Sequence, residues 1–181
     1  MRVVAGQLRG RKIEGPRGDA TRPTTDKVRE AIFNALASMD ALHDARVIDL
    51  FAGSGALGIE ALSRGASYCV FVERDKDALV AVRRNIEALD LRDCSEVAPR
   101  DAIGALSQYR DVDLVLADPP YGFSEWNTLL ADCCAPVVVL ESNREIGDVA
   151  GYTTVRERRY GRTFVAILRH EGLAEGTVED T

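Results

Sequence analysis

The chain has 181 residues, of which 46% are hydrophobic and 29% are charged, and its formal net charge is −6. This is the size and composition of one ordinary globular domain, which can bury its own core without covalent staples. No apolar run approaches the roughly 18 to 20 residues that cross a bilayer, and the basic opening segment has no apolar stretch behind it. We therefore expect a cytoplasmic protein without a membrane segment.

The four cysteines and two histidines do not form a metal-binding pattern. No Cys-x-x-Cys pair is present, and His43 and His170 lie far apart in the sequence. Free, buried thiols in a reducing compartment are therefore expected, with no bound metal.

Charge is divided unevenly along the chain. Residues 1–29 carry eight Lys or Arg against three acids, net +5, whereas the remainder carries 15 against 26, net −11. An acidic body repels a polyanion, so any nucleic acid is expected mainly at the N-terminal end. A solvated basic arm without a partner is the alternative.

The first 40 residues predict a small hairpin and a helix. Residues 2–5 and 11–14 are strand-like and are joined through glycines. After Pro23, a threonine can cap a helix whose apolar face recurs at helical spacing. That face consists of Val28, Ile32, Ala35, Leu36 and Met39.

From Arg46 onward, strands alternate with helices, which predicts a parallel sheet covered on both faces. The expected strands are residues 47–51, 68–73, 95–98, 113–117 and 137–141. The expected helices run through residues 57–62, from Asp75 to Leu89, briefly from Asp101, and through 126–134. Residues 152–160 and 163–169 flank Gly161 without a long helix and predict an antiparallel hairpin at one edge. The residues from Glu171 onward are expected to form a frayed acidic tail.

A glycine-rich turn, Gly53-Ser54-Gly55-Ala56-Leu57-Gly58, follows the first strand of this alternation and opens a helix. Glycine allows the backbone to turn sharply and to approach a ligand, and in such sheets the ligand lies beyond the carboxyl ends of the strands. The pattern also matches the dinucleotide fingerprint, with Glu73 placed to accept from a ribose. An NAD-linked oxidoreductase is therefore a serious alternative. Asp49 favours S-adenosylmethionine, because a carboxylate near a pyrophosphate is costly and near a sulfonium is favourable.

A second motif, Asp-Pro-Pro-Tyr, follows the buried strand that ends at Ala117. The prolines remove backbone donors, so local carbonyls and the carboxylate of Asp118 can accept both hydrogens of an exocyclic amine on a nucleic-acid base. An aromatic ring can stack on that base, and the rest of the catalysis is positioning. The residues assigned to catalysis are Asp118, Pro119, Pro120 and Tyr121.

Four separated motifs together resemble the bacterial 16S rRNA guanine-N2 methyltransferases. They are Arg22-Pro23-Thr24, the helix segment 28–34, the segment 49–55 and the tetrapeptide 118–121, and the opening residues resemble that family's N-terminal extension. The resemblance implies a Rossmann-like class I methyltransferase fold, α/β, with a seven-stranded, mostly parallel sheet and an antiparallel closing strand. It divides the chain into a basic β-hairpin extension (1–21), the methyltransferase domain (22–170) and an acidic flexible tail (171–181).

The resemblance also implies the partners and the ligand contacts. The substrate would be N2 of one guanine in 16S rRNA, within the assembled 30S particle, and we expect a monomer. The cofactor would be S-adenosylmethionine, with Gly53 and Gly55 at its methionine part, Glu73 at the ribose and Asp101 at the adenine amine. The residues assigned to the cofactor are Thr24, Asp49, Gly53, Ser54, Gly55, Glu73, Arg74, Asp101 and Ala102. The residues assigned to RNA are Arg9, Arg11, Lys12, Arg17 and Arg22.

Three alternatives stay open from the sequence. The tetrapeptide chemistry suits any exocyclic amine, so a DNA adenine-N6 or cytosine-N4 methyltransferase is one, although no segment suited to reading a DNA groove is evident. The NAD-linked oxidoreductase is the second. A binding protein that acts in ribosome assembly without catalysis is the third.

Overall fold

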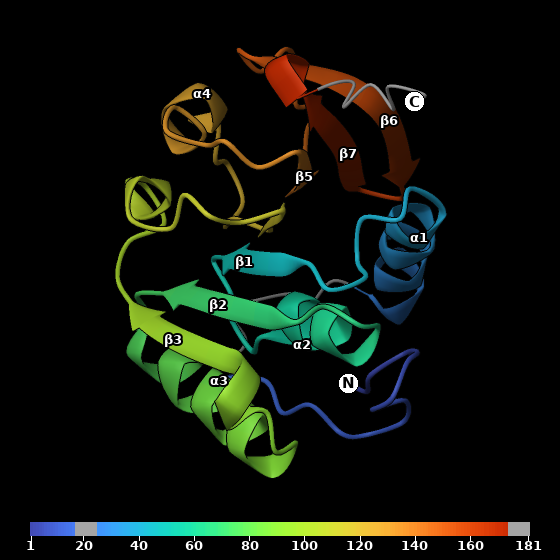
Figure 1. Cartoon of the computed structure of the whole chain (residues 1–181), viewed down its shortest axis with the longest axis vertical. Coiled ribbons are helices and arrows are strands. Elements are labelled where there is room, and N and C mark those ends of the chain that lie inside the picture. The colour runs from blue at the N-terminus through green and yellow to red at the C-terminus, as the bar shows by residue number, and fades with distance from the viewer. Residues whose placement is uncertain (17–24, 174–181) are drawn as a thin grey trace, which may run out of the picture.

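A computed structural model of the chain describes residues 1–16 and 25–173. Its strands form one seven-stranded sheet in the order β3-β2-β1-β4-β5-β7-β6 (Figure 1). β1 to β5 are mutually parallel, and β7 is antiparallel to both β5 and β6. The strands are β1 (Arg46–Leu50), β2 (Tyr68–Glu73), β3 (Ser95–Pro99), β4 (Leu114–Ala117), β5 (Val137–Ser142), β6 (Tyr152–Tyr160) and β7 (Thr163–His170). The mostly parallel sheet with an antiparallel closing strand is confirmed.

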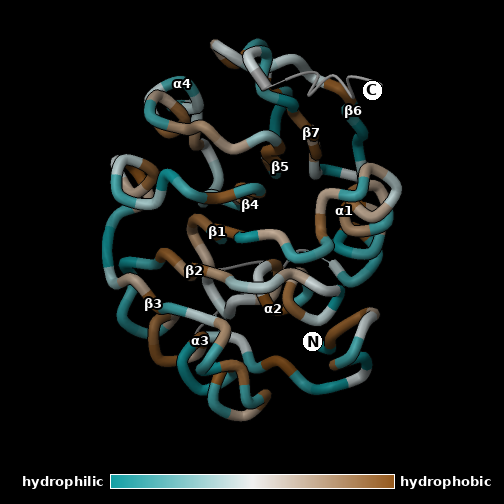
Figure 2. Tube along the Cα trace, in the orientation of Figure 1, coloured by the Kyte–Doolittle hydropathy of each residue, from teal (hydrophilic) through white to brown (hydrophobic). Residues whose placement is uncertain are grey.

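Helices cover both faces of this sheet. The helices are α1 (Asp26–Ser38), α2 (Ala56–Ser63), α3 (Lys76–Ala88) and α4 (Trp126–Leu129), with 3-10 turns at Arg92–Cys94, Ala105–Ser107 and Glu171–Leu173. α1, α2 and α3 contribute to one apolar core, and α4 contributes to a second core on the other face. Because both faces are covered, the central strands are largely apolar, with Asp49 of β1 as a buried exception, and the brown trace of Figure 2 shows this for parts of β1, β2 and β4.

The helix caps follow from local sequence. Thr25 Oγ1 accepts the amide of Val28 at the start of α1, and Asp75 Oδ1 accepts two amides at the start of α3. Each cap satisfies amides that have no partner within the helix. Both predicted caps are confirmed.

Two predicted helices are shorter in the structure. The helix expected from Asp101 is only the 3-10 turn Ala105–Ser107, because Asp101 Oδ1 accepts the amide of Ile103 in a tight turn and Gly104 has a φ of 80°. The helix expected over 126–134 ends at Leu129. A side chain that bonds its own nearby backbone competes with helix formation, which explains the first difference.

The predicted N-terminal hairpin is present but short: an antiparallel bridge joins Arg2 and Lys12, and backbone bonds link residues 1–3 with residues 10–13. The hairpin also bonds to α2. The buried carboxylate of Glu60 accepts the amides of Val4 (2.8 Å) and Ala5 (3.0 Å), and Ser63 Oγ accepts the amide of Leu8 (3.0 Å). These amides face α2 rather than the other half of the hairpin, so the hairpin forms an arm held against α2.

The described residues contain no helix with the length and apolarity needed to span a membrane. All four cysteines are free; Cys69 and Cys133 are buried as expected, whereas Cys134 is exposed. Of the acidic tail predicted from Glu171 onward, Glu171–Leu173 form a 3-10 turn instead of a frayed end, and residues 174–181 lie outside the described residues.

Gly58 tests how α2 packs on β2. A Cβ at this position would lie 2.4 Å from Phe71 Cε1 and 2.5 Å from Cys69 Sγ, and both neighbours are fully buried. Replacing Gly by Ala inside a helix usually stabilises it by about 1 kcal/mol. Here the steric cost of the extra methyl group, roughly 1–3 kcal/mol, outweighs that stabilisation. We expect Gly58→Ala to lower the free energy of unfolding in a denaturant titration, whereas Gly15→Ala, whose Cβ meets nothing within 4 Å, leaves it nearly unchanged.

Candidate active site

The two motifs found in the sequence lie at the same edge of the sheet. The strand register pairs Leu50 with Val72 on one side and with Ala117 on the other. The next residue along each strand direction is Phe51 at the start of the glycine turn, Glu73 after Val72, and Asp118 after Ala117. The parallel alignment therefore brings the glycine turn beside the tetrapeptide, although about 65 residues separate them in sequence.

Aromatic contacts join the two loops directly. The ring of Phe51, at the start of the glycine turn, packs edge-on against Phe123, two residues past the tetrapeptide, at 5.4 Å between centroids. Phe123 packs in the same way on Trp126 at 4.9 Å. Phe51 has a φ of 61°, a left-handed conformation that is rare for a bulky residue. Such strain persists where the surroundings hold it, and it often marks a functional loop.

The glycines of the turn have different tasks. A Cβ on Gly55 would lie 2.8 Å from Val82 Cγ2, and Gly58 is crowded by β2, so both permit close packing inside the molecule. Gly53, with a φ of 57°, has no neighbour closer than 3.9 Å to the Cβ position. Gly53 is therefore the glycine of the turn that presents open backbone to a ligand.

Glu73 holds the glycine turn in place. One carboxylate oxygen accepts the amide of Gly53 at 2.8 Å, and the other accepts the amides of Arg74 (2.7 Å) and Asp75 (2.8 Å). A carboxylate offers about four acceptor positions, so one remains for a ligand hydroxyl. The predicted ribose contact at Glu73 stays a prediction, and the structure adds that the same residue fixes the loop.

Asp49 is buried rather than exposed to a ligand. Its Oδ2 accepts the amide of Gly58 at 2.9 Å and so holds the start of α2. Burial raises the pKa of Asp49 well above its ordinary value, and the nearby carboxylates of Asp118 and Glu73 raise that pKa further. Three carboxylates thus converge at this edge, which is a favourable place for a cation and an unfavourable one for a pyrophosphate.

An ion pair joins the carboxyl ends of β2 and β3. Arg74 Nη1 lies 2.5 Å from Asp101 Oδ2, across the ends of β2 and β3. The amide of Ile103 and the guanidinium of Arg74 both hold the pKa of Asp101 below its ordinary value, so its carboxylate remains an acceptor. Ala102 is buried beside it, whereas Ile103 is an exposed large apolar side chain that the sequence analysis did not assign.

The tetrapeptide presents its aromatic ring outward. Pro119 is buried, Asp118 is partly buried, and Tyr121 is 70% exposed. The carbonyl of Pro120 accepts the amide of Phe123 at 3.2 Å. Arg144, in the segment after β5, donates from Nη2 to the carbonyl of Gly122 and so supports the loop from the neighbouring strand.

Of the predicted RNA contacts, those on the N-terminal arm lie toward the other edge of the sheet. α2 and α3 each run back from the carboxyl ends of the strands, so their last residues lie at the amino edge. The arm contacts those last residues: the amide of Gln7 bonds the carbonyl of Ser63, and Arg11 Nη2 bonds the carbonyl of Ala88. Arg9 and Lys12 are exposed, and Lys12 pairs with Glu14 at 3.0 Å. Thr24, Arg17 and Arg22 lie outside the described residues.

Asn85 links this arm to the glycine turn, a connection that sequence reasoning missed. Its amide nitrogen donates to the carbonyls of Glu14 and Ser54, each at 2.8 Å, and its amide oxygen accepts the amide of Glu14 at 2.9 Å. Asn85 is buried on α3, where an asparagine in an otherwise apolar helical face is the one signal that could have revealed it.

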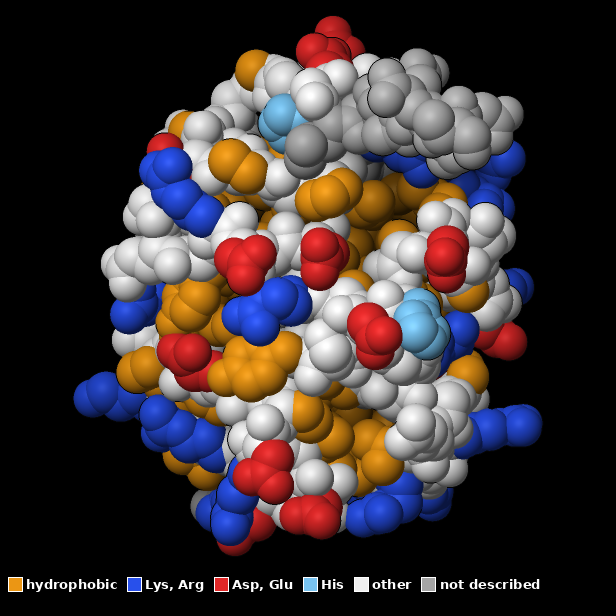
Figure 3. All heavy atoms as spheres, viewed as in Figure 1, with side chains coloured by type: hydrophobic (Ala, Val, Ile, Leu, Met, Phe, Trp, Pro, Cys, Tyr) orange, Lys and Arg blue, Asp and Glu red, His pale blue; other side chains and the backbone are white. Residues whose placement is uncertain are grey.

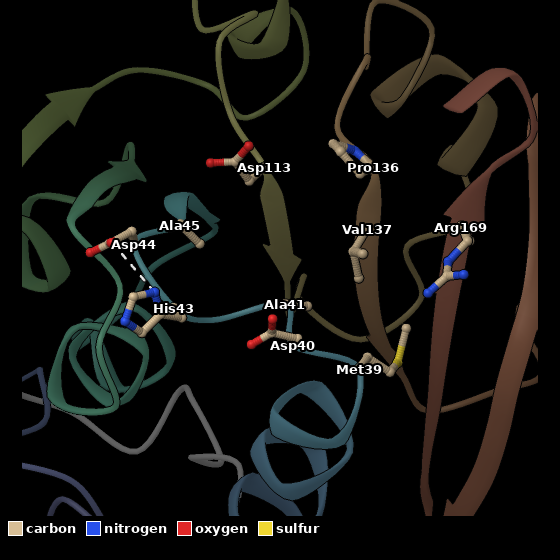
Figure 4. A pocket seen from close by; sticks show the side chains of 10 residues that line it. All are labelled: Met39, Asp40, Ala41, His43, Asp44, Ala45, Asp113, Pro136, Val137 and Arg169. Carbon is tan, nitrogen blue, oxygen red and sulfur yellow. Dashed lines mark ion pairs between the residues drawn. The ribbon is translucent and has the colours of Figure 1, made fainter. Parts of the chain in front are cut away.

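A hollow of about 410 Å³ lies away from this site. Its lining, shown in Figure 4, comes from the end of α1 and the loop to β1, the starts of β4 and β5 and the end of β7. These are the amino ends of the parallel strands, opposite the glycine turn. Figure 3 shows the same face, with acidic side chains across its middle. Among the described residues, no group of three His, Cys, Asp or Glu could hold a metal ion.

Comparison with known proteins agrees with this arrangement. A family model described as "Conserved hypothetical protein 95" matches residues 1–169. The Escherichia coli (strain K12) "Ribosomal RNA small subunit methyltransferase D" is 33% identical, covering 99% of this chain and 94% of its own length. A Bacillus subtilis (strain 168) protein described as "Putative rRNA methyltransferase YlbH" is 38% identical over 95% of this chain and 100% of its own. A solved structure of the "Putative methyltransferase yhhF" from Escherichia coli superimposes with a TM-score of 0.81, at 36% identity, covering 94% of this chain and 98% of that chain.

The sheet order, the closing antiparallel strand and the site at the carboxyl edge define a Rossmann-like class I methyltransferase fold. The chain belongs to the "Conserved hypothetical protein 95" family, together with the small-subunit rRNA methyltransferase D proteins.

Asn85 tests the link between the arm and the glycine turn. Asn85→Asp replaces the donor with an acceptor that faces two carbonyls, and a buried unsatisfied group of this kind costs roughly 1–3 kcal/mol. We expect a lower free energy of unfolding and faster hydrogen exchange at the Glu14 amide. The control is Asn127→Asp, because among the described residues Asn127 acts as an acceptor, for the amide of Ala150, and not as a donor. Unchanged protection at Glu14 in Asn85→Asp would show that the two donor contacts of Asn85 are not needed to hold the arm.

Proposed function

We propose that this protein transfers a methyl group from S-adenosylmethionine to the exocyclic N2 amine of one guanine in 16S rRNA, within the assembled 30S particle. The observation that carries the proposal is the shared edge: the glycine turn and the tetrapeptide lie on neighbouring strands and are joined through Phe51 and Phe123. The chain is an S-adenosylmethionine-dependent methyltransferase that acts on rRNA, and its relatives named as small-subunit rRNA methyltransferases support this class.

The residues present fit the cofactor. Gly53 leaves open backbone at the turn, and Glu73 keeps acceptor capacity for a ribose hydroxyl. Asp101 can accept from an adenine amine, and the exposed side chain of Ile103 offers an apolar surface for the ring. The convergent carboxylates favour a cationic methionine moiety over a pyrophosphate, which argues against the oxidoreductase alternative. S-Adenosylmethionine supplies an activated methyl group on a sulfonium, so no strong base is needed.

The tetrapeptide is suited to hold the amine. The Asp118 carboxylate would accept one hydrogen of the amine. Because the Pro120 carbonyl already accepts the amide of Phe123, the Pro119 carbonyl is the one assigned to the second hydrogen. Both contacts would keep the nitrogen lone pair directed at the methyl group and make the nitrogen more nucleophilic. The exposed ring of Tyr121 would stack on the guanine, worth roughly 1–3 kcal/mol, which helps offset the cost of extruding the base.

Asp118 tests the assigned chemistry. With labelled S-adenosylmethionine and 30S particles that lack the modification, the wild-type protein should label 16S rRNA, and mass analysis should find N2-methylguanine. Asp118→Ala should lower kcat by a factor on the order of 10² or more, as the loss of a group aimed at the transition state does, while cofactor affinity stays within about twofold. The control is Asp111→Ala, whose exposed side chain lies near the amino end of the same strand.

The same assay separates the alternatives. Transfer of label to DNA and not to ribosomal particles would favour a DNA amino-methyltransferase. Full activity of Asp118→Ala on 30S particles would contradict the assigned mechanism. Restoration of ribosome assembly by an inactive Asp118→Ala protein in cells would support a role that does not need catalysis.

A further inference from the structure

The edge strand β6 is unusually exposed. Of its nine residues only Tyr152 is buried, and every residue from Thr153 to Arg159 is exposed, so side chains on both faces of the strand are exposed. Four arginines lie on this strand and on the turn to β7. We call these four the arginine hairpin: Arg156, Arg158, Arg159 and Arg162. Within the described residues, none of the four forms an ion pair with an acidic side chain.

This hairpin is a basic region in an acidic body. Residues 152–170 contain five arginines and one acid, Glu157, whereas the chain beyond residue 29 has a net charge of −11. Blue side chains lie along the upper right margin of Figure 3, where Figure 1 places β6. A concentration of unpaired cations of this kind attracts a polyanion.

The strand register shows that the end of the β6–β7 hairpin that carries these arginines lies at the same edge of the sheet as the tetrapeptide. Ala117 pairs with Leu140, Leu140 with Ala166, and Ala166 with Glu157. One residue further along, Asp118, which directly follows β4, is therefore level with Arg158 on β6. Three strand spacings of about 4.8 Å separate the two strands, or roughly 14 Å. The turn that holds Arg162 lies beyond the same edge.

Two further contacts fix this surface relative to the site. Tyr160 packs against the apolar core to which β7 contributes Val165 and Ile167, and so anchors the end of β6. Arg144, between the hairpin and the tetrapeptide in strand order, is bonded to the carbonyl of Gly122. Arg144 is therefore a further cation between the arginine hairpin and the loop that carries Tyr121.

Charged side chains on an edge strand can also have a different role: they prevent the free edge of the sheet from pairing with another chain. In β6 that task is already served by a bulge between Thr154 and Arg156, which interrupts the ladder. Edge protection also does not explain why the cations gather at the end nearest the tetrapeptide.

We propose that the arginine hairpin binds the phosphate backbone of the RNA next to the guanine that enters the site. This inference rests on the proposed function and adds a second RNA surface, at the catalytic edge, that the charge distribution along the sequence did not indicate. Arginine suits the role because its planar guanidinium matches a phosphate with two hydrogen bonds. Backbone contacts of this kind position the RNA without reading its sequence.

The test compares arginines at the two ends of the β6–β7 hairpin. The variant is Arg156→Gln/Arg158→Gln/Arg162→Gln; Arg159 is kept, because it stacks on Phe164 at 5.2 Å and bonds the carbonyl of Gly161. The control is Arg169→Gln, an exposed arginine of β7 that pairs with Val137 at the opposite edge. A second control, with all three arginines changed to Lys, keeps the charge.

Binding to protein-free 16S rRNA and to 30S particles is measured at several salt concentrations. The Gln variant should bind both substrates about tenfold or more weakly near 0.1 M salt, and the slope of log K against log salt should become shallower by about 2, since each lost phosphate contact removes roughly 0.7–0.9. Arg169→Gln should match the wild type, the Lys variant should keep most of the affinity, and the affinity for S-adenosylmethionine should be unchanged throughout.

Each other outcome has a distinct meaning. Unchanged RNA affinity and salt slope in the Gln variant, with methylation of rRNA by the wild type intact, would overturn the hairpin proposal alone. Weaker binding to 30S particles but not to protein-free rRNA would also overturn it and would indicate a contact with ribosomal protein. A wild-type protein that labels no rRNA would instead overturn the proposed function. Should the Gln variant not fold, Arg158→Gln alone carries the test, with a slope change of about 1.

Discussion

The alignment of β1, β2 and β4 is the constraint on which the site depends. Because these strands are parallel and in register, three carboxylates that are distant in sequence converge at one edge of the sheet. Two of them also hold the backbone: Glu73 bonds the glycine turn and Asp49 bonds the first turn of α2. Two of the three carboxyl groups at the site therefore also set the shape of the loop. A cationic ligand can lower the electrostatic cost of this arrangement, and an anionic ligand would increase it.

Much of the fold could be predicted from the sequence because the strands are buried on both faces and bounded by turn residues. The apolar runs of β1, β4 and β5, the cap at Asp75 and the hairpin around Gly161 all carry local signals. The position of the N-terminal hairpin was not predictable in this way because it depends on a partner that is not local: the amides of Val4 and Ala5 bond to Glu60, more than 50 residues away. A strand pattern in the local sequence does not reveal a carboxylate on a distant helix.

The candidate site could be predicted in outline for the same reason. Both loops follow recognisable strands, so their shared edge follows from topology. The roles within the loops were less accessible. Gly58 and Gly55 serve packing while Gly53 is open, and this division depends on the positions of Phe71, Cys69 and Val82. Asn85 and Arg144 act through backbone carbonyls of segments remote in sequence, which no spacing rule reveals. The charge count located a basic end of the chain but not the arginines at the catalytic edge.

The most direct test of the central claim is a crystal structure of the protein with S-adenosylhomocysteine. We expect the ligand to lie against Gly53 and Glu73, with its sulfur facing the gap between the Asp118 carboxylate and the Pro119 carbonyl. That gap should leave room for a guanine amine within methyl-transfer reach, with reacting atoms about 3–3.5 Å apart. A ligand bound in the hollow at the amino ends of the strands, or one whose sulfur faces away from Asp118, would contradict the central claim.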